Sequence, residues 1–283
     1  MVISETTQKL IYLIYVLGIR KERLMAVYRK FSDNMDKTFR YFNVRPSFKN
    51  STKLYNILKS IKNNGIGAID ITDVDYPWLL KNIITAPPIL FIKGRPLLQN
   101  LKIAVVGTRK ASSYGLKAAA YWGARLSKAG LTVVSGLAHG IDSSAQEAAL
   151  NHKGGSIGVL GCGIGYVYPI QNNYLFKRIV QNGTLISEYL PYSTPKKINF
   201  IQRNRIISGL CGGTLVVESA ERGGSLITAN FALEQGREVF AVPGSIFSPV
   251  SQGTHNLIQN GAKLVYRLEH VLDELIEAGN KLS

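Results

Sequence analysis

The sequence predicts an α/β protein in which a small all-α domain precedes a doubly wound, mostly parallel sheet. From residue 101 onward, short apolar runs rich in β-branched residues recur, and each is followed by a glycine-bearing turn and a helix-length segment. This alternation is typical of parallel strands joined by helices. The first 64 residues show helical periodicity instead. We therefore place a helical domain at 1–66 and the sheet domain at 67–283.

Helices are expected throughout the N-terminal domain. Apolar residues recur at helical spacing between Leu10 and Leu17, Gly18 interrupts them, and the segment RKERLMAVYRKF resumes the pattern. Two short helices joined by a tight turn would give this arrangement. A third helix is expected over STKLYNILKSIKNNG, with Ser51 as its N-terminal cap and Gly65 at its C-terminal end.

The strands of the predicted sheet follow in order. Residues 73–94 mix prolines with short apolar runs and predict a connector of strand and loop. Runs that are apolar throughout then indicate strands covered by helices on both faces. These runs are residues 102–108, 131–137, 156–163, 184–189, 213–219 and 238–244. The last segment, EHVLDELIEAGNKLS, predicts an amphipathic helix, and no further domain is expected behind it.

The composition favours a polyanionic partner and a reducing compartment. Lys and Arg outnumber Asp and Glu by 34 to 18, which gives a net charge of +16. Cys162 and Cys211 form no CxxC pair, so we expect buried thiols rather than a disulfide framework or a zinc site. The apolar run between Lys9 and Arg20 is too short to span a membrane and lacks a cleavage site. We expect a cytoplasmic protein with no membrane partner.

The first loop of the sheet, GTRKASSYG at 107–115, joins a strand to a helix through a glycine turn, as phosphate-binding turns do. A dinucleotide does not fit it. Gly107 is followed by Thr108 and Arg109 rather than by a second glycine, and the next strand ends at Ser135 instead of an acidic residue for the ribose. The glycine cluster at 161–165 lacks the context that a dinucleotide site requires.

Hydrolytic and metal-dependent chemistry also has little support. The four histidines show no metal-ligand spacing, and Ser135 does not lie in a G-x-S-x-G turn. We expect Asp142 to cap the helix that follows it. Glu218 and Glu221 lie at the SAERGGS loop, and Arg222 beside them suggests a structural ion pair rather than acid–base work. The sequence therefore predicts no catalytic residue, no metal and no cofactor, and the protein is not expected to be an enzyme.

Phosphate binding without catalysis remains, and the segment 193–209 supports it. This segment contains Lys196, Lys197, Arg203 and Arg205, and it has no acidic residue. Phe200 lies among these cations, in a loop by our interpretation. Cations that neutralise phosphates, interleaved with a ring that stacks on bases, suit single-stranded nucleic acid, although Phe200 could instead be a core residue.

Arg109 and the RGGS segment at 222–225 would extend the same electropositive surface. Duplex DNA is a less favoured ligand, because the chain contains no helix-turn-helix, zinc finger or basic zipper.

Six ordered sequence blocks resemble the DNA processing protein A family, DprA/Smf. They are VVGTR at 105–109, VVSGLAHGID at 133–142, YPIQN at 168–172, FIQRNRIISGL at 200–210, ERGGSLITANFALEQGREVFAVPGS at 221–245 and GTHNLIQNGAKLV at 253–265. Their order and spacing fit the family over roughly residues 70–268. The N-terminal helices are similar only in character to the sterile-alpha-motif-like module of some members.

The resemblance implies an extended Rossmann-like fold and a cytoplasmic, non-catalytic protein. The family binds single-stranded DNA during natural transformation, shields the strand and helps to load RecA, and its members are usually homodimers. The resemblance also implies DNA-binding residues: Gly107 and Arg109 match the family's Gly-x-Arg, Lys197 and Phe200 its Lys-x-x-Phe, Arg203 and Arg205 its Arg-Asn-Arg, and Gly223, Gly224 and Ser225 its Gly-Ser-Leu-Ile-Thr loop.

The chain departs from the family pattern in three respects. Thr108 replaces a common Ser, Ile170 replaces a common basic residue, and we expect no winged-helix domain after the sheet domain. The departure at Ile170 predicts that this edge of the DNA-binding surface contributes less to DNA binding.

Two other functions remain open. A lysine-decarboxylase-like nucleoside-monophosphate hydrolase would need a Pro-Gly-Gly-x-Gly-Thr turn with a Glu beyond it, where this chain has ERGGSLIT. A purely structural RecA partner would make no DNA contact at all.

Overall fold

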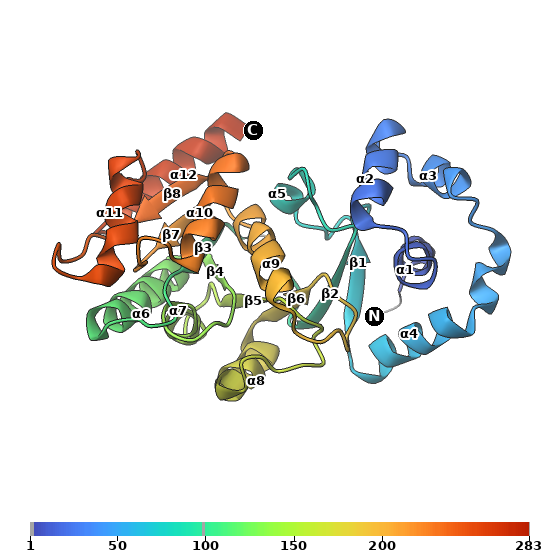
Figure 1. Ribbon diagram of the computed structural model, residues 1–283, viewed down its shortest axis with the longest axis horizontal. Helices are drawn as coiled ribbons and strands as arrows, with labels where there is room; N and C mark the ends of the chain where they lie inside the picture. The colour runs from blue at the N-terminus through green and yellow to red at the C-terminus, as the bar shows by residue number, and fades with distance from the viewer. Residues whose placement is uncertain (1–2, 98–99, 283) are drawn as a thin grey trace.

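A single nine-stranded sheet runs through the computed structural model, which describes residues 3–97 and 100–282 (Figure 1). The strand order is β1-β2-β6-β5-β4-β3-β7-β8-β9. The pairs β1–β2 and β2–β6 are antiparallel, and the other pairs are parallel. The strands are β1 (Gly67–Asp70), β2 (Ile89–Gly94), β3 (Lys102–Val106), β4 (Thr132–Ser135), β5 (Ser156–Leu160), β6 (Thr184–Ser187), β7 (Gly213–Val216), β8 (Glu238–Ala241) and β9 (Lys263–Leu264).

The predicted α/β class is confirmed, and each of the six apolar runs contains a strand. Strand β3 shows why such runs are apolar throughout. Its residues Ile103 and Val105 enter one buried cluster, and Ala104 and Val106 enter the other, because successive side chains of a strand point to opposite faces. Both faces must therefore be covered.

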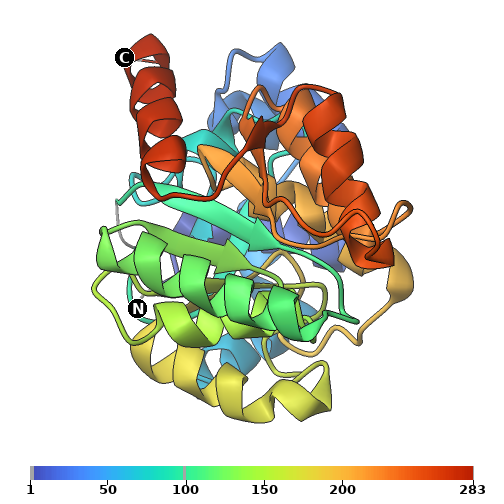
Figure 2. The same cartoon turned by 90° about the vertical axis from the view of Figure 1, so that its left-hand side faces the viewer.

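Helices cover both faces of the sheet. Helices α6 (Ser113–Lys128), α7 (Ile141–Ala149) and α12 (Glu269–Leu282) supply one cluster, and α6 crosses the front of the sheet in Figure 2. Helices α8 (Asn173–Asn182), α9 (Lys197–Gly209) and α10 (Gly224–Glu234) supply the other cluster. Helix α11 (Gln252–Gln259) packs beside β8. None of the helices in the described ranges is long and apolar enough to cross a bilayer.

The N-terminal helices pack on the antiparallel edge of the sheet. The predicted break at Gly18, with φ at 72°, and the Ser51 cap, which accepts from Leu54 N at 3.3 Å, are both confirmed. The elements are α1 (Glu5–Ile11), the π-helix η1 (Tyr12–Val16), α2 (Lys21–Lys30), α3 (Met35–Tyr41), η2 (Pro46–Asn50) and α4 (Thr52–Asn63). Their buried side chains join the cluster that contains β1 and β2. The division at residue 66 stays a prediction.

The α-helices and strands that were not predicted are short, namely α3, α5 (Trp78–Lys81), β1 and β9. Each has seven residues or fewer, so its periodicity is too short to recognise in the sequence.

The chain reverses its direction of winding at the centre of the sheet. From β3 it adds β4, β5 and β6 on one side, and it then returns to place β7 on the other side of β3. Ligands of open α/β sheets bind in the crevice beyond such a switch point, where the loops that follow the two central strands diverge. Here the loops after β3 and β7 flank that crevice.

Candidate nucleic-acid interface

A pocket of about 740 Å³ lies at the switch point. The loops after β3 and β4 and the first turns of α9 and α10 form its walls. Among the predicted site residues, those that line it are Gly107, Arg109, Lys197, Phe200, Arg203, Gly223, Gly224 and Ser225. Arg205 does not line it. The pocket also contains residues that sequence reasoning did not assign to the site, among them Lys110, Tyr168 and Asn204.

Residues 197–205 lie in helix α9, so our interpretation of the segment 196–205 as a loop was wrong. With 3.6 residues per turn, Lys197, Phe200 and Asn204 fall on one face of α9, and all of them line the pocket. Arg205 lies about 100° further round the helix than Asn204, and its side chain points away from the pocket toward Glu188. Helical periodicity is the signal that finds Asn204 and separates Arg205 from the pocket.

Phe200 contributes to the pocket and also packs against its wall. The side chain is half-buried, and its ring centroid lies 5.0 Å from that of Tyr168 at an interplanar angle of 41°. Gly161 allows this position, because a Cβ there would lie 2.7 Å from the Phe200 ring. Tyr168 remains 43% exposed, so the pair presents aromatic surface at the mouth of the pocket. An aromatic residue in a glycine-rich loop after a central strand is the signal for Tyr168.

Two helix N-termini at the pocket have no side-chain cap. The N-cap residues are Lys196 for α9 and Gly223 for α10. The Lys196 side chain bonds no first-turn N–H group, and Gly223 has no side chain that could do so. The next residues, Lys197 and Gly224, line the pocket. Unpaired N–H groups and the helix dipole make such ends favourable for anions. The exposed cations Arg109, Lys110 and Lys197 add to the same positive potential.

The N-terminus of α6 is filled by the protein's own groups. Ser112 Oγ accepts from Gly115 N at 3.0 Å, and the Glu218 carboxylate accepts from both Ser112 N (3.0 Å) and Ser112 Oγ (2.5 Å). Glu218 is 2% exposed, and a Cβ on Gly115 would collide with its carboxylate. The expected ion pair is therefore wrong: within the described residues neither Glu218 nor Glu221 pairs with Arg222, and Glu218 is bound to Ser112 instead.

Arg203 lines the pocket but is 4% exposed. Its Nη1 donates to Gly136 O at 2.9 Å and to Val159 O, which joins the ends of β4 and β5. Burial lowers the pKa of the guanidinium to about 10, so it stays charged at neutral pH. This charge faces Asp142. Arg203 thus links the ends of β4 and β5 beneath the pocket, and it contributes a positive charge to the pocket from its buried side.

Asp142 does not cap α7, contrary to the expectation. Gly140 is the N-cap residue, and Asp142 Oδ2 accepts from Gly136 N at 3.1 Å. Burial raises the pKa of Asp142, and the charge of Arg203 opposes that effect. The carboxylate is fully engaged with the loop that carries Gly136 and with Arg203.

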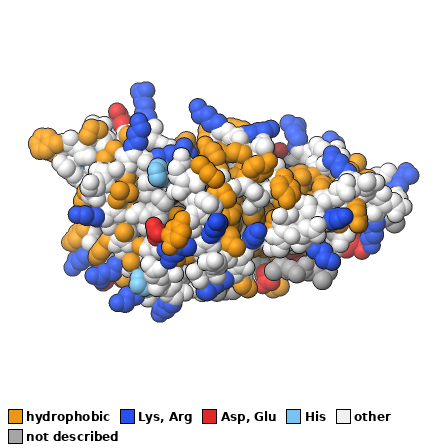
Figure 3. Space-filling view, turned by 90° about the horizontal axis from the view of Figure 1, so that it is seen from below, with side chains coloured by type: hydrophobic (Ala, Val, Ile, Leu, Met, Phe, Trp, Pro, Cys, Tyr) orange, Lys and Arg blue, Asp and Glu red, His pale blue; other side chains and the backbone are white. Residues whose placement is uncertain are grey.

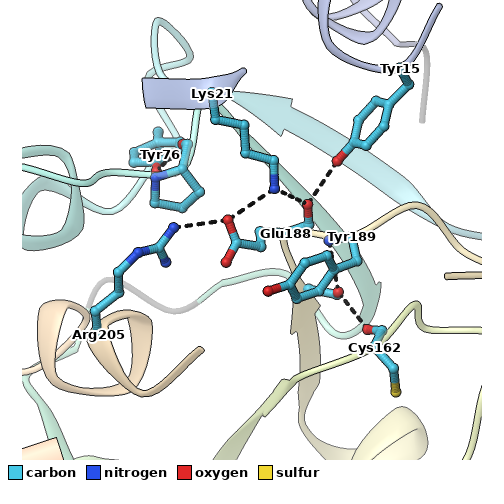
Figure 4. A network of polar contacts seen from close by, with 9 residues as sticks. Tyr15, Lys21, Tyr76, Cys162, Glu188, Tyr189 and Arg205 are labelled. Atoms are coloured by element: carbon cyan, nitrogen blue, oxygen red, sulfur yellow. Dashed lines mark hydrogen bonds and ion pairs between the residues drawn. The ribbon is translucent and has the colours of Figure 1, made fainter. Parts of the chain in front are cut away.

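Arg205 belongs to a buried network on the other side of α9 (Figure 4). Its Nη2 donates to Glu188 Oε2 at 2.9 Å, and Lys21 Nζ donates to the same oxygen at 3.0 Å. Tyr15 donates its hydroxyl proton to the carbonyl oxygen of Glu188 at 2.8 Å. Burial alone would raise the pKa of Glu188, but Lys21 and Arg205 outweigh it and the pKa lies below the ordinary value. The network ties α9 to the N-terminal helices.

Relatives of the chain are DNA processing proteins. DprA of Bacillus subtilis is 43% identical over 227 residues, which cover 80% of this chain and 76% of that protein. The X-ray structure of DprA from Streptococcus pneumoniae has a TM-score of 0.80 and 38% identity, over 97% of this chain and 99% of that one.

The structure of DprA from Helicobacter pylori, which is described for its single-stranded DNA binding mode, has a TM-score of 0.68 and 27% identity, over 75% of this chain and 96% of that one. The family model described as DNA recombination-mediator protein A matches residues 67–276, which include every residue that lines the pocket. The chain belongs to the DNA recombination-mediator protein A family.

Proposed function

We propose that this protein binds single-stranded DNA without sequence specificity, shields it, and helps to load RecA onto it during natural transformation and recombination. One observation carries the proposal. At the switch point of the sheet, exposed cations, two uncapped helix N-termini and the Phe200–Tyr168 pair converge on one pocket. The single-stranded DNA binding of the Helicobacter pylori relative supports the same ligand.

The proposed contacts follow from the chemistry of the lining. Arg109 and Lys197 pair with phosphates, and the first N–H groups of α9 and α10 donate to phosphate oxygens. Phe200 and Tyr168 stack on bases, which every base permits because each has a π-face. These contacts read the backbone and the base faces rather than the base edges, so no sequence preference is expected.

The proposed role is that of a mediator rather than an enzyme. Asp142 and Glu218, the buried carboxylates nearest the switch point, are each occupied by hydrogen bonds within the protein. The description of the family as a DNA recombination mediator supports the proposed RecA partnership, and we extend to this chain the cytoplasmic location and the homodimer that the sequence resemblance implies. The DNA-binding role expected of Arg205 stays a prediction.

The proposal is tested by fluorescence anisotropy on labelled single-stranded and duplex DNA of equal length, over a series of salt concentrations. We expect tight, salt-sensitive binding to the single strand alone. Lys197→Ala should weaken binding and reduce the slope of log K against log salt by about 0.7–1, the value for one lost phosphate contact. The matched control is Lys128→Ala, since Lys128 is exposed in the last turn of α6, just before β4 begins and so at the strand ends opposite the pocket.

Equal loss in the two lysine variants would show that the overall charge, and not the pocket, binds DNA. Absence of single-strand binding by the parent would contradict the proposal. Release of free base from a nucleoside monophosphate would support the hydrolase instead. RecA association that persists without intrinsic DNA binding would support a purely structural partner. If the single strand binds, RecA filament assembly on that strand, with and without the protein, tests the loading step.

A further inference from the structure

The exposed face of α8 continues from the aromatic mouth of the pocket. Tyr168 lines the pocket, and α8 begins five residues later at Asn173 after a single 3₁₀ turn. Asn172 anchors that turn, because its side-chain N–H donates to Leu137 O at 2.7 Å. The start of α8 is therefore fixed beside the pocket loops.

The outward face of α8 carries an aromatic ring and two cations. Tyr174 is 67% exposed, Lys177 is exposed, and Arg178 lies with its guanidinium carbon 5.7 Å from the centroid of the Tyr174 ring. The opposite face, with Leu175 and Ile179, is buried. A large ring held at the surface of a packed helix, beside cations, is the arrangement that binds single strands through stacking and phosphate contacts.

The charge of this surface also favours a polyanion. Residues 148–187 include no Asp or Glu. Glu147 of α7 lies beside this surface, and its carboxylate is paired with Arg178 at 3.3 Å. Lys177 has no ion-pair partner within the described residues. Helix α8 lies at the lower edge of Figure 1, and Figure 3 shows that this face of the molecule carries many cationic and few acidic side chains.

On the basis of the proposed function, we infer that single-stranded DNA leaving the pocket past Tyr168 continues over the exposed face of α8. Tyr174 stacks on a base, and Lys177 pairs with a phosphate. The edge at Ile170, which is 67% exposed, then contributes apolar contact in place of the missing basic residue.

The distance suits a short stretch of DNA. Tyr174 is the sixth residue after Tyr168, so their Cα atoms lie within about 20 Å, the reach of an extended chain of that length. At about 3.4 Å per stacked nucleotide, this gap corresponds to at most about six nucleotides. Tyr174 should therefore contact long strands but not those that only fill the pocket.

The experiment compares two lengths of labelled oligothymidine, about 3 and about 20 nucleotides, which lie below and above typical site sizes of about 4–16. Tyr174→Ala should weaken binding of the long strand at least fivefold, equivalent to about 1 kcal/mol, and leave the short strand unchanged. Lys177→Ala should lower the salt slope for the long strand only. The matched control is Tyr55→Ala in α4, because Tyr55 is 61% exposed and has Lys59 Nζ at 6.0 Å from its ring.

The outcomes separate this inference from the proposed function. If Tyr174→Ala binds both lengths like the parent while Lys197→Ala loses binding, the path over α8 is wrong and the pocket stands. Equal weakening of both lengths by Tyr174→Ala, with unchanged thermal unfolding, places the ring at the pocket and also overturns the path. If the parent binds neither length, both proposals fail.

Discussion

Helix α9 presents two cationic faces with opposite surroundings. On one face, Lys197 is exposed at a pocket that contains no exposed acidic side chain. On the other face, Arg205 is 14% exposed and is neutralised by Glu188, which it shares with Lys21. Both cations belong to one stretch of sequence without acidic residues. The difference shows that the environment of a cation, and not the local sequence alone, decides whether its charge is available to a ligand.

The largest effect is expected when the carboxylate that Lys21 and Arg205 share is neutralised. Glu188→Gln should lower the free energy of unfolding by about 3–5 kcal/mol, the range for breaking a buried ion pair from one side. Chemical denaturation measures this loss. Glu147→Gln is the control, because its exposed carboxylate also pairs with an arginine. An equal effect of the two variants would mean that burial of the Glu188 network contributes nothing.

The same network predicts a direction of pH dependence. Because the folded-state pKa of Glu188 lies below its ordinary value of 4.5, its contribution to stability is complete above that value and is lost as the pH falls through the folded pKa. The stability difference between the parent and Glu188→Gln should thus be constant near neutral pH and shrink under acid conditions. Denaturation curves over the acid range measure it, and a difference that grows with acidity would contradict the assignment.

The next test concerns Arg205 itself. Arg205→Ala removes a charge-assisted hydrogen bond but leaves Lys21 on Glu188, so we expect a loss of about 1.5–3 kcal/mol in unfolding free energy. Single-strand affinity, measured at a temperature where the variant is folded, should stay close to that of the parent. A loss of affinity as large as that of Lys197→Ala would instead confirm the DNA-binding role expected from the sequence.

A substitution of Phe200 tests the pocket face of α9. Phe200→Ala should weaken single-strand binding by about 1–3 kcal/mol for each base that stacks on the ring. Phe200→Tyr preserves the stacking surface and is the matched control. Anisotropy titrations give the affinities, and equal binding by the alanine variant would assign Phe200 to packing against Gly161 alone.

The smallest effect is expected at the start of α6. Ser112→Ala removes the cap of α6 and one contact to Glu218, so the unfolding free energy should fall by about 1 kcal/mol. Single-strand affinity should not change, because this helix start is already filled. A drop in affinity without a drop in stability would show that Ser112 contacts DNA.

The sheet could be predicted because the same sequence pattern occurs six times along the chain. Six apolar runs separated by helix-length segments define a parallel sheet, and alternate residues of β3 do enter two different cores. Short elements such as α3 and β9 were not predicted, because α3 spans only about two helical turns and β9 only two residues. The C-terminal end of β4 was also predicted correctly, at Ser135.

The site was predicted less completely, for a physical reason. The residues that line the pocket converge from loops and helices that are distant in sequence, and their free or paired state depends on partners elsewhere. Glu188, which binds Arg205, is 17 residues away, and Lys21 lies in the N-terminal helices. Treating 196–205 as a helix would have placed Arg205 off the pocket face, but no local signal reveals its partner.

The carboxylate at the start of α6 has a consequence for selectivity inside a cell. Free nucleotides and dinucleotide cofactors are abundant competitors for any open sheet with a glycine turn at its centre. Here the place where their pyrophosphate would lie in such a fold holds the carboxylate of Glu218, seated over Gly115. The protein thus carries a resident anion at the helix start that holds the pyrophosphate in dinucleotide-binding sheets. Its remaining anion-binding surface is spread over α9 and α10, where a polymer with many phosphates gains far more than a single small molecule.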